Sequence, residues 1–294
     1  MNPGVPAPPP TLCGRQVPAD RPLVMAIVNR TPDSFYDRGA TFSDDAAMRR
    51  VDEAVADGAD ILDIGGVKAG PGDAVDAGEE TRRVVPFVEA VRARHPDALL
   101  SVDTWRGDVA RRALSAGADL VNDTWAGHDP EVLTAAADAG AGFVCSHTGG
   151  AVPRTRPFRV GYEDVVADVV AELSAGAERA LAAGVPRDGI LVDPTHDFGK
   201  NTFHGLELVR RTDRIVALGH PVLMALSNKD FVGETLDAGI DDRRDGTLAA
   251  TSIAAYLGAR VFRTHDVPGT LATLEMVASI VGTRPPARTV RGLA

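Results

Sequence analysis

Short apolar segments rich in Val, Ile and Leu recur along the chain and alternate with longer amphipathic segments. Each apolar segment is too short for a helix and is bounded by Gly, Pro, Asn or Asp, which is typical of a buried parallel strand. Amphipathic segments predict helices, for example at Asp44–Ala59, Glu79–Arg94, Tyr162–Ala183 and Gly246–Leu257. Eight alternations predict a single-domain α/β fold, the (β/α)8 TIM barrel, with a doubly wound open sheet as the alternative. The eight predicted strands are Leu23–Asn29, Ile61–Gly66, Leu99–Thr104, Leu120–Asp123, Gly142–His147, Gly189–Pro194, Pro221–Leu226 and Arg260–Asp266.

The two ends of the chain differ in composition from the predicted barrel, which we place at residues 23–283. Residues 1–22 are rich in proline and predict a disordered, extended arm, and residues 284–294 form a basic tail. The net charge of -10 argues against nucleic acid as a partner, because phosphate binding needs clustered Lys and Arg. No apolar run is long enough for a membrane span. Two cysteines make no disulfide framework, so we expect a cytoplasmic protein.

Polar residues stand at the end of every predicted strand. In a barrel the carboxyl ends of the strands meet at one mouth, so these side chains are expected to surround one small-molecule site. Carboxylates and an amide can bind the ring N–H groups of a flat heterocycle, although each could instead cap a helix or form a turn. The candidates of this kind are Asp63, Asp103, Asn122 and Asp193.

Cationic side chains follow the last two predicted strands. Lys229 follows the seventh strand, and Arg263 and His265 belong to the eighth. Because Arg263 and His265 are two residues apart, they share one face of a strand and could bind one phosphate group together. The alternative for these cations is ion pairing with the nearby aspartates. Asn29 could bind Mg2+ that is held mainly by phosphate and water.

Taken together, these segments resemble dihydropteroate synthase from about Leu23 to Ile280. The matching motifs are Val28-Asn29-Arg30-Thr31-Pro32-Asp33-Ser34-Phe35, Asp63-Ile64-Gly65-Gly66, Ser101-Val102-Asp103-Thr104, Asn122-Asp123, Asp193-Pro194, Phe198-Gly199-Lys200, Ser227-Asn228-Lys229 and Arg263-Thr264-His265-Asp266. The resemblance implies a TIM barrel that joins 6-hydroxymethyl-7,8-dihydropterin diphosphate to p-aminobenzoate and releases diphosphate. It also implies Mg2+ as cofactor, a homodimer, and sulfonamides as competitors of aminobenzoate.

The resemblance also implies a role for each matched residue. Asp103, Asn122, Asp193 and Lys229 would hold the pterin. The expected catalytic residues are Asp63, Asp103, Lys229, Arg263 and His265. Asn29, Arg263 and His265 would bind the diphosphate with Mg2+, so Arg263→Ala is expected to weaken diphosphate binding and to spare plain pterin. Four further residues would border the aminobenzoate, namely Phe35, Pro71, Phe198 and Ser227.

Three segments depart from the family pattern, and they resemble the diverged second copies found in actinobacteria. The loop that usually reads Glu-Ser-Thr-Arg-Pro-Gly is Val67-Lys68-Ala69-Gly70-Pro71-Gly72, in which Lys68 would restore part of the lost positive charge. Asn228 replaces a second Arg, and Thr195-His196-Asp197 replaces Gly-x-Gly. Of these, His196 is expected to be a solvent-exposed loop residue rather than a ligand.

These observations leave three hypotheses for the function. The first is a working dihydropteroate synthase, favoured by the cations and Asn29 that would bind diphosphate. The second is a weak or inactive paralogue that binds a pterin or a partner protein, favoured by Gly70 and Asn228, because each lost guanidinium removes charge-assisted hydrogen bonds. The third is the pterin domain of a corrinoid-linked methyltransferase, which needs no diphosphate site.

Overall fold

Eight parallel strands form the centre of the fold, in the hydrogen-bonded order β8-β7-β6-β5-β4-β3-β10-β9. A bridge between Val192 in β8 and Val222, just before β9, joins the two edges and closes the barrel. The structure is a computed structural model and describes residues 11–31, 44–68, 70, 72–154 and 161–291. The strands are β3 (Leu23–Asn29), β4 (Ile61–Gly65), β5 (Leu99–Asp103), β6 (Leu120–Asn122), β7 (Gly142–Ser146), β8 (Ile190–Asp193), β9 (Leu223–Met224) and β10 (Val261–Thr264).

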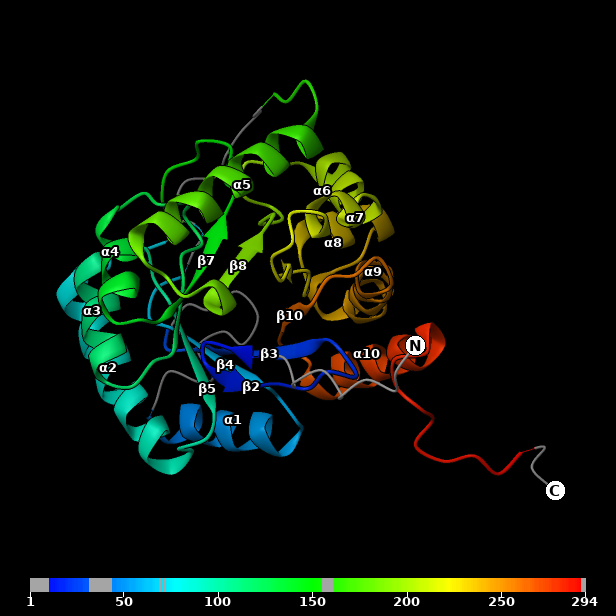
Figure 1. Ribbon diagram of the computed structural model, residues 1–294, viewed down its shortest axis with the longest axis horizontal. Coiled ribbons are helices and arrows are strands. Elements are labelled where there is room, and N and C mark those ends of the chain that lie inside the picture. The colour runs from blue at the N-terminus through cyan, green and yellow to red at the C-terminus, as the bar shows by residue number, and fades with distance from the viewer. Residues whose placement is uncertain (1–10, 32–43, 69, 71, 155–160, 292–294) are drawn as a thin grey trace, which may run out of the picture.

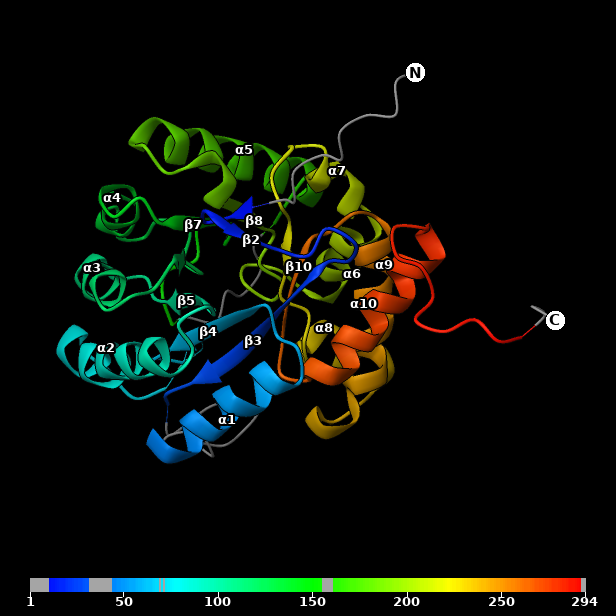
Figure 2. The same ribbon diagram turned by 60° about the horizontal axis from the view of Figure 1, so that its bottom comes forward.

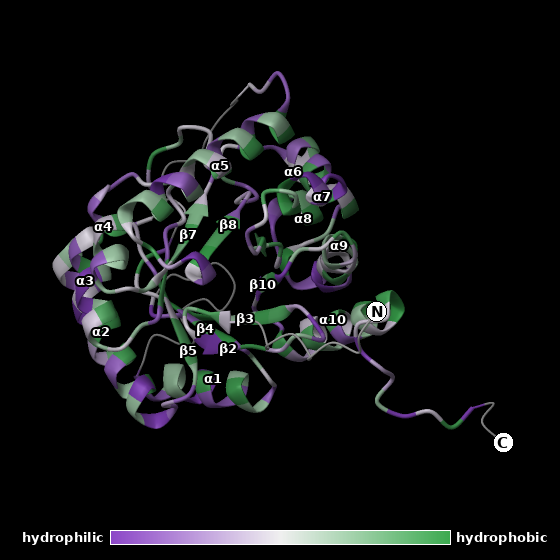
Figure 3. Cartoon of the chain, viewed as in Figure 1, coloured by the Kyte–Doolittle hydropathy of each residue, from purple (hydrophilic) through white to green (hydrophobic). Residues whose placement is uncertain are grey.

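Helices surround the strands (Figure 1), and the view in Figure 2 shows the same ring from another side. Apolar side chains on the outer face of the strands pack against the inner faces of the helices in one large cluster. In Figure 3 strands such as β3 and β8 are hydrophobic, while the helices carry both hydrophobic and hydrophilic residues. The helices are α1 (Asp44–Ala56), α2 (Ala77–Arg94), α3 (Gly107–Ser115), α4 (Glu131–Asp138), α5 (Val165–Ala183), α6 (Thr202–Arg210), α7 (Thr212–Val216), α8 (Asp230–Leu236), α9 (Arg244–Tyr256) and α10 (Val267–Val281), with short 3-10 turns at Arg187–Gly189 and Ile240–Asp242.

The inside of the barrel changes from apolar to polar along the strands. Alternate residues of a strand point inward, so β4 contributes first Ile61 and then Asp63, and β10 contributes first Val261 and then Arg263. The inward residues at the amino ends of the strands form a second, separate apolar cluster. The polar residues therefore lie one layer higher, toward the carboxyl ends, which is the position that the TIM barrel predicts for a site.

The amino-terminal segment differs from the extended arm that the sequence predicted over residues 1–22. Strands β1 (Thr11–Leu12) and β2 (Arg15–Gln16) form a small antiparallel hairpin. The side chain of Leu12 is only 2% exposed and belongs to the apolar cluster at the base of the barrel. The hairpin therefore closes this end, because burying Leu12 removes apolar surface from water. Residues 1–10 lie outside the described residues.

The predicted strands are confirmed, and most of their predicted ends differ from the observed ends by one or two residues. The largest difference is the seventh strand, predicted over Pro221–Leu226 and observed as the two-residue strand β9. At the other end of the chain, residues 285–291 are exposed, while Arg284 forms ion pairs with Asp20 and Glu275. In the part of the chain that the structure describes, no helix combines the length and hydropathy that a bilayer span requires.

Candidate functional site

Arg263 connects two of the predicted carboxylates at the mouth of the barrel. Its Nε lies 2.6 Å from Asp63 Oδ2, and its Nη2 lies 2.8 Å from Asp103 Oδ2. Burial opposes the charged form of Arg263, but the two carboxylates outweigh burial and raise the pKa of the guanidinium above its ordinary value. The ion pairing that the sequence left as an alternative to phosphate binding is therefore present in this structure.

Neighbouring strands supply hydrogen bonds that fix both carboxylates. On Asp63, Oδ1 accepts a 2.6 Å bond from Ser101 Oγ, and Oδ2 accepts a 3.3 Å bond from Asn122 Nδ2. Asp103 Oδ1 accepts a 3.3 Å bond from Thr124 Oγ1. Asn122 Oδ1 is buried and accepts no hydrogen bond from the described residues. The layer thus presents an unsatisfied acceptor that an N–H group of a ligand would pair with.

Burial changes the protonation of two aspartates in this layer. Against the opposing effect of Arg263, burial raises the pKa of Asp103 to about 7, with a smaller contribution from the nearby carboxylate of Asp63. Burial also raises the pKa of Asp193 to about 6, against the opposing effects of the Thr195 N–H, Lys229, Lys200 and Arg263. Strongly perturbed carboxyls are enriched at functional sites, because such sites combine burial with charged neighbours.

The remaining predicted cations lie on the β9 and β10 side of the mouth. Lys229 Nζ lies 5.1 Å from the centre of the Phe198 ring, a cation–π distance. Ser227 Oγ and His265 Nδ1 are 3.0 Å apart, and the His265 N–H donates to the same hydroxyl. Arg263, Lys229 and the Ser227–His265 pair therefore border one side of the carboxylate layer.

An aromatic cluster lies next to this layer and was not predicted from the sequence. The ring centroids of Trp125 and Phe198 are 4.8 Å apart, and those of Trp105 and Trp125 are 6.5 Å apart, both in edge-on geometry. Val67 from the altered loop packs into the same cluster. Both tryptophans of the chain thus lie beside the site, and their fluorescence can report on it.

Lys200 is a second group that the sequence analysis placed in a motif without a role. Its Nζ donates to three backbone carbonyls, those of His147 and Phe198 at 2.8 Å and of Thr195 at 3.2 Å. Burial lowers the pKa of this ammonium to about 7. Lys200 therefore connects the loops after β7 and β8, a role that the sequence pattern around this lysine does not reveal.

Comparison with known proteins decides the family. A family model described as "Pterin binding enzyme" matches residues 25–265. A Mycobacterium leprae protein with the name inactive dihydropteroate synthase 2 is 65% identical over 287 residues, covering 96% of this chain and 99% of that protein. The dihydropteroate synthase of Haemophilus influenzae is 39% identical over 256 residues, covering 87% and 92% of the two chains. The chain belongs to the dihydropteroate synthase family.

A solved dihydropteroate synthase agrees with the fold described above. The crystal structure of the Yersinia pestis enzyme with a sulfonamide drug superposes with a TM-score of 0.87 at 35% identity, covering 93% of this chain and 99% of that chain. The TIM barrel predicted from the sequence is therefore confirmed, and the open-sheet alternative is wrong.

The departures from the dihydropteroate synthase pattern have visible structural consequences. Thr195 and Asp197 have φ angles of 51° and 71°, in the left-handed region that suits the glycines usual there. His196 is fully buried against Phe231, and its ring nitrogens have no hydrogen-bond partner among the described residues. Burial lowers its pKa to about 3, so the ring is neutral. The expectation of a solvent-exposed His196 is wrong, because the loop folds inward over the β8 end.

The remaining predicted site residues are Asn29, Lys68, Phe35 and Pro71. Asn29 ends β3 and pairs in register with Gly65, at the same height as the polar layer. Lys68 is half-buried in the loop after β4. Two of the predicted aminobenzoate neighbours, Phe35 and Pro71, lie outside the described residues.

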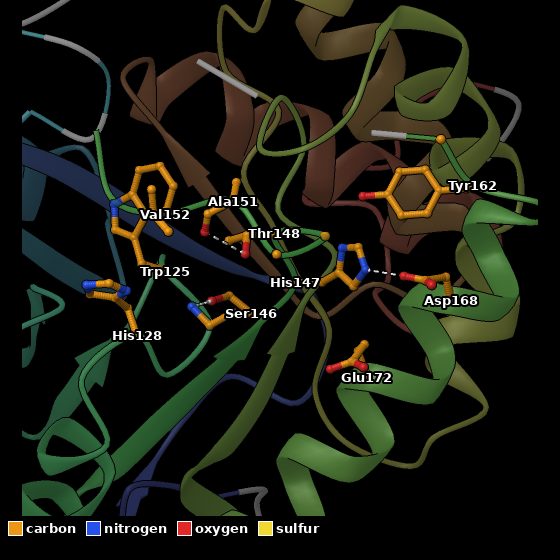
Figure 4. A pocket seen from close by; sticks show the side chains of 14 residues that line it. Trp125, His128, Ser146, His147, Thr148, Ala151, Val152, Tyr162, Asp168 and Glu172 are labelled. Atoms are coloured by element: carbon orange, nitrogen blue, oxygen red, sulfur yellow. Dashed lines mark hydrogen bonds and ion pairs between the residues drawn. The ribbon is translucent and has the colours of Figure 1, made fainter. Parts of the chain in front are cut away.

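A cavity of about 570 Å³ lies beside the polar layer rather than within it. Figure 4 shows Trp125 and His128 on one side, Asp168 and Glu172 on the other, and His147 between them. His147 Nε2 is 2.7 Å from an Asp168 oxygen. The lining contains none of the predicted pterin-site carboxylates, so this cavity is separate from the layer in which the perturbed carboxyls and cations meet.

Proposed function

We propose that this protein binds a pterin at the barrel mouth and is weak or inactive in the condensation that dihydropteroate synthases catalyse. The observation that most supports this proposal is the network around Arg263, in which Asp63, Asp103 and Asn122 form one hydrogen-bonded layer. This layer has carboxylate and amide groups for the edge of an aminopyrimidinone ring. The resemblance in sequence and the similarity to the inactive paralogue of Mycobacterium leprae both support this proposal.

Pterin binding would use the carboxylates and the buried amide at the mouth. Asp193 and Asp103 would accept ring N–H and NH2 groups, and Asn122 Oδ1 would gain the partner it lacks in this structure. Lys229 would donate to a ring oxygen or nitrogen from the opposite side. Because both carboxyls are already buried, their hydrogen bonds to a bound pterin would be strengthened by the low dielectric.

Weak condensation follows from the altered loops. The leaving diphosphate carries most of the charge that a synthase must stabilise, and the chain has Gly70 and Asn228 where the family pattern has Arg. At least two N–H groups of Arg263 already bond to carboxylates, which leaves fewer for an anion. Each lost charge-assisted contact removes about 1.5–3 kcal/mol of stabilisation, or roughly one to two decades of rate.

A working synthase is the second candidate, and it is favoured by the side chains that could bind the diphosphate. Asn29 at the end of β3, Arg263 in the adjacent strand β10 and His265 directly after β10 all lie at the same mouth. The donor set fits Mg2+, because one amide oxygen together with phosphate oxygens and water is a usual magnesium environment. When bound, Mg2+ would neutralise charge on the leaving diphosphate, while Arg263 and His265 orient it.

The deciding experiment measures binding and turnover in the same protein preparation. Tryptophan fluorescence would follow titration with the pterin diphosphate and with the plain 6-hydroxymethyl pterin, since Trp105 and Trp125 lie beside the site. Diphosphate release would then be measured with p-aminobenzoate and Mg2+. Binding with no turnover above background is expected. Turnover at the rate of the Haemophilus influenzae enzyme would establish the second candidate instead. Absence of pterin binding would refute the proposal, and binding of a methylated pterin alone would favour the methyltransferase alternative.

Two further expectations belong to the same proposal. We expect a homodimer, because α9 and α10 expose the apolar side chains of Ile253, Tyr256, Met276 and Ile280. Sedimentation velocity would test it, and a monomer at micromolar concentration would contradict it. We also expect a cytoplasmic location, with which the free thiols of Cys13 and Cys145 are compatible.

A further inference from the structure

Lys229 occupies a position in the fold for which lysine is chemically unsuited. It is the N-cap residue of the short helix α8, with extended backbone angles of φ -67° and ψ 156°, and its side chain makes no capping bond. A good N-cap side chain accepts a hydrogen bond from a backbone N–H of the first turn, and a protonated lysine has donors only. The beginning of α8 therefore needs an acceptor from elsewhere in the chain.

Asp197 supplies that acceptor from a loop 33 residues away. Its Oδ2 accepts a 2.9 Å hydrogen bond from the backbone N–H of Asp230, the first residue of α8. Asp197 has a φ angle of 71°, and this backbone conformation is less favourable for a residue with a Cβ than for glycine. Asp is one of the few residues that tolerates this region. The backbone strain is thus offset by a contact that only a residue with a side chain can make.

The residues on both sides of Lys229 are held by α9. Arg243 Nη1 donates to the Asn228 carbonyl at 2.9 Å and to Asp230 Oδ1 at 3.0 Å. The Asn228 N–H donates to Thr247 Oγ1 at 3.2 Å. Both residues that flank Lys229 are therefore fixed by hydrogen bonds, while the Lys229 side chain extends over Phe198.

We propose that Asp197 is a positioning residue for Lys229: by capping α8 in place of Lys229, it holds the ammonium group over Phe198 where a pterin would meet it. This rests on the proposed pterin site. It also explains two of the departures together, because Thr195-His196-Asp197 and Asn228 belong to loops that the Asp197–Asp230 bond connects directly. A glycine at position 197 would leave the Asp230 N–H without this acceptor.

The first test is a double-mutant cycle on pterin affinity, read by tryptophan fluorescence. Asp197→Ala is expected to weaken binding of the plain 6-hydroxymethyl pterin about fivefold, or about 1 kcal/mol, because the Lys229 ammonium is no longer held over Phe198. Asp197→Asn should restore affinity to within about twofold, because its amide oxygen still accepts the N–H. In a Lys229→Met background, Asp197→Ala should change affinity by less than about twofold, since the group it positions is gone.

The second test needs no ligand and uses the small number of lysines. The chain has Lys68, Lys200 and Lys229, so limited acetylation with acetic anhydride and peptide mass spectrometry reports each one separately. Asp197→Ala should change the acetylation rate of Lys229 at least about threefold relative to Lys68, and Asp197→Asn should not. This readout decides the inference even if Lys229→Met binds too weakly to measure, or if the wild-type protein binds no pterin and the proposed function fails.

The matched control is Asp164→Ala, which removes the N-cap side chain of α5. Asp164 accepts from the N–H groups of Val166 and Ala167 and is exposed. It should lower stability like any lost cap but leave pterin affinity and Lys229 acetylation unchanged. If Asp197→Ala matches this control in both readouts, or weakens binding equally with and without Lys229, Asp197 has only a structural role and the inference is wrong.

Discussion

Replacing Asp193 by Asn should make the protein more stable at alkaline pH while it abolishes tight pterin binding. Asp193 is 1% exposed, and its Oδ1 accepts a 2.7 Å bond from the Thr195 N–H. An asparagine keeps an acceptor at this position and loses only the charge. The substitution therefore isolates the free energy of holding a buried carboxylate at the mouth.

The magnitude follows from the raised pKa. Burial raises the pKa of Asp193 from 3.8 to about 6, and one unit corresponds to about 1.4 kcal/mol. The folded state holds the proton more tightly than the unfolded state, so this stability is present below about pH 4 and is lost as the pH rises through 6. Above pH 7 the ionised carboxylate lowers the free energy of unfolding by about 3 kcal/mol relative to the protonated form. About half of this loss of stability occurs between pH 5 and pH 8.

Thermal unfolding at pH 5 and at pH 8 measures this effect. The difference in Tm between Asp193→Asn and wild type should grow by about 3–6 °C from the acidic to the alkaline condition. At pH 8 pterin affinity should fall about ten- to a hundredfold, the loss of a charge-assisted hydrogen bond. Asp164→Asn, a change at an exposed helix cap, is the control and should show no such growth. Parallel pH dependences of Asp193→Asn and wild type would refute the argument.

Three other changes test separate parts of the structure. Leu12→Ala should cost about 2–5 kcal/mol in urea unfolding, because Leu12 is buried in the base of the barrel; a cost below 1 kcal/mol would mean that the hairpin is not docked. Arg263→Met should lower the free energy of unfolding by about 3–5 kcal/mol at pH 8, because Asp63 and Asp103 lose their counter-charge. It should also abolish plain pterin binding, contrary to the expectation from the sequence, and retained pterin affinity in a fluorescence titration would contradict this. Gly70→Arg should raise diphosphate release if a missing guanidinium limits turnover, because among the described residues a Cβ at this position meets nothing nearer than Lys68 Cε at 3.8 Å. An unchanged rate would remove that explanation.

The strands and the polar layer could be predicted because they depend on local pattern and on one rule of barrels. Apolar runs bounded by turn residues marked the strands, and the common direction of parallel strands placed Asp63, Asp103 and Asn122 at one mouth. A local rule also accounts for the start of α2, where the N-cap Asp76 accepts a hydrogen bond from the Glu79 N–H.

The partners of these residues could not be predicted, because they come from other strands and loops. Ser101 precedes Asp103 by two residues, so inward alternation could have suggested its bond to Asp63, but no pattern indicates that Asn122 donates to the same carboxylate. Whether Arg263 faces a phosphate or two aspartates likewise depends on distances across the barrel. Proline content at the amino terminus predicted disorder, whereas the burial of Leu12 depends on a hydrophobic base that only the closed barrel provides.

The amino-acid sequence by itself determined the class of fold, the end of the barrel that carries the chemistry and the residue types that meet there. These features follow from short apolar runs, which become buried, and from the alternating direction of side chains along a strand. Both can be read from a few neighbouring residues. The tertiary structure alone decided which charges neutralise each other, that His196 is buried, and that Asp197 caps the helix after Lys229. Electrostatic and hydrogen-bond energies depend on distances of a few ångströms between segments far apart in the chain, and only folding sets those distances.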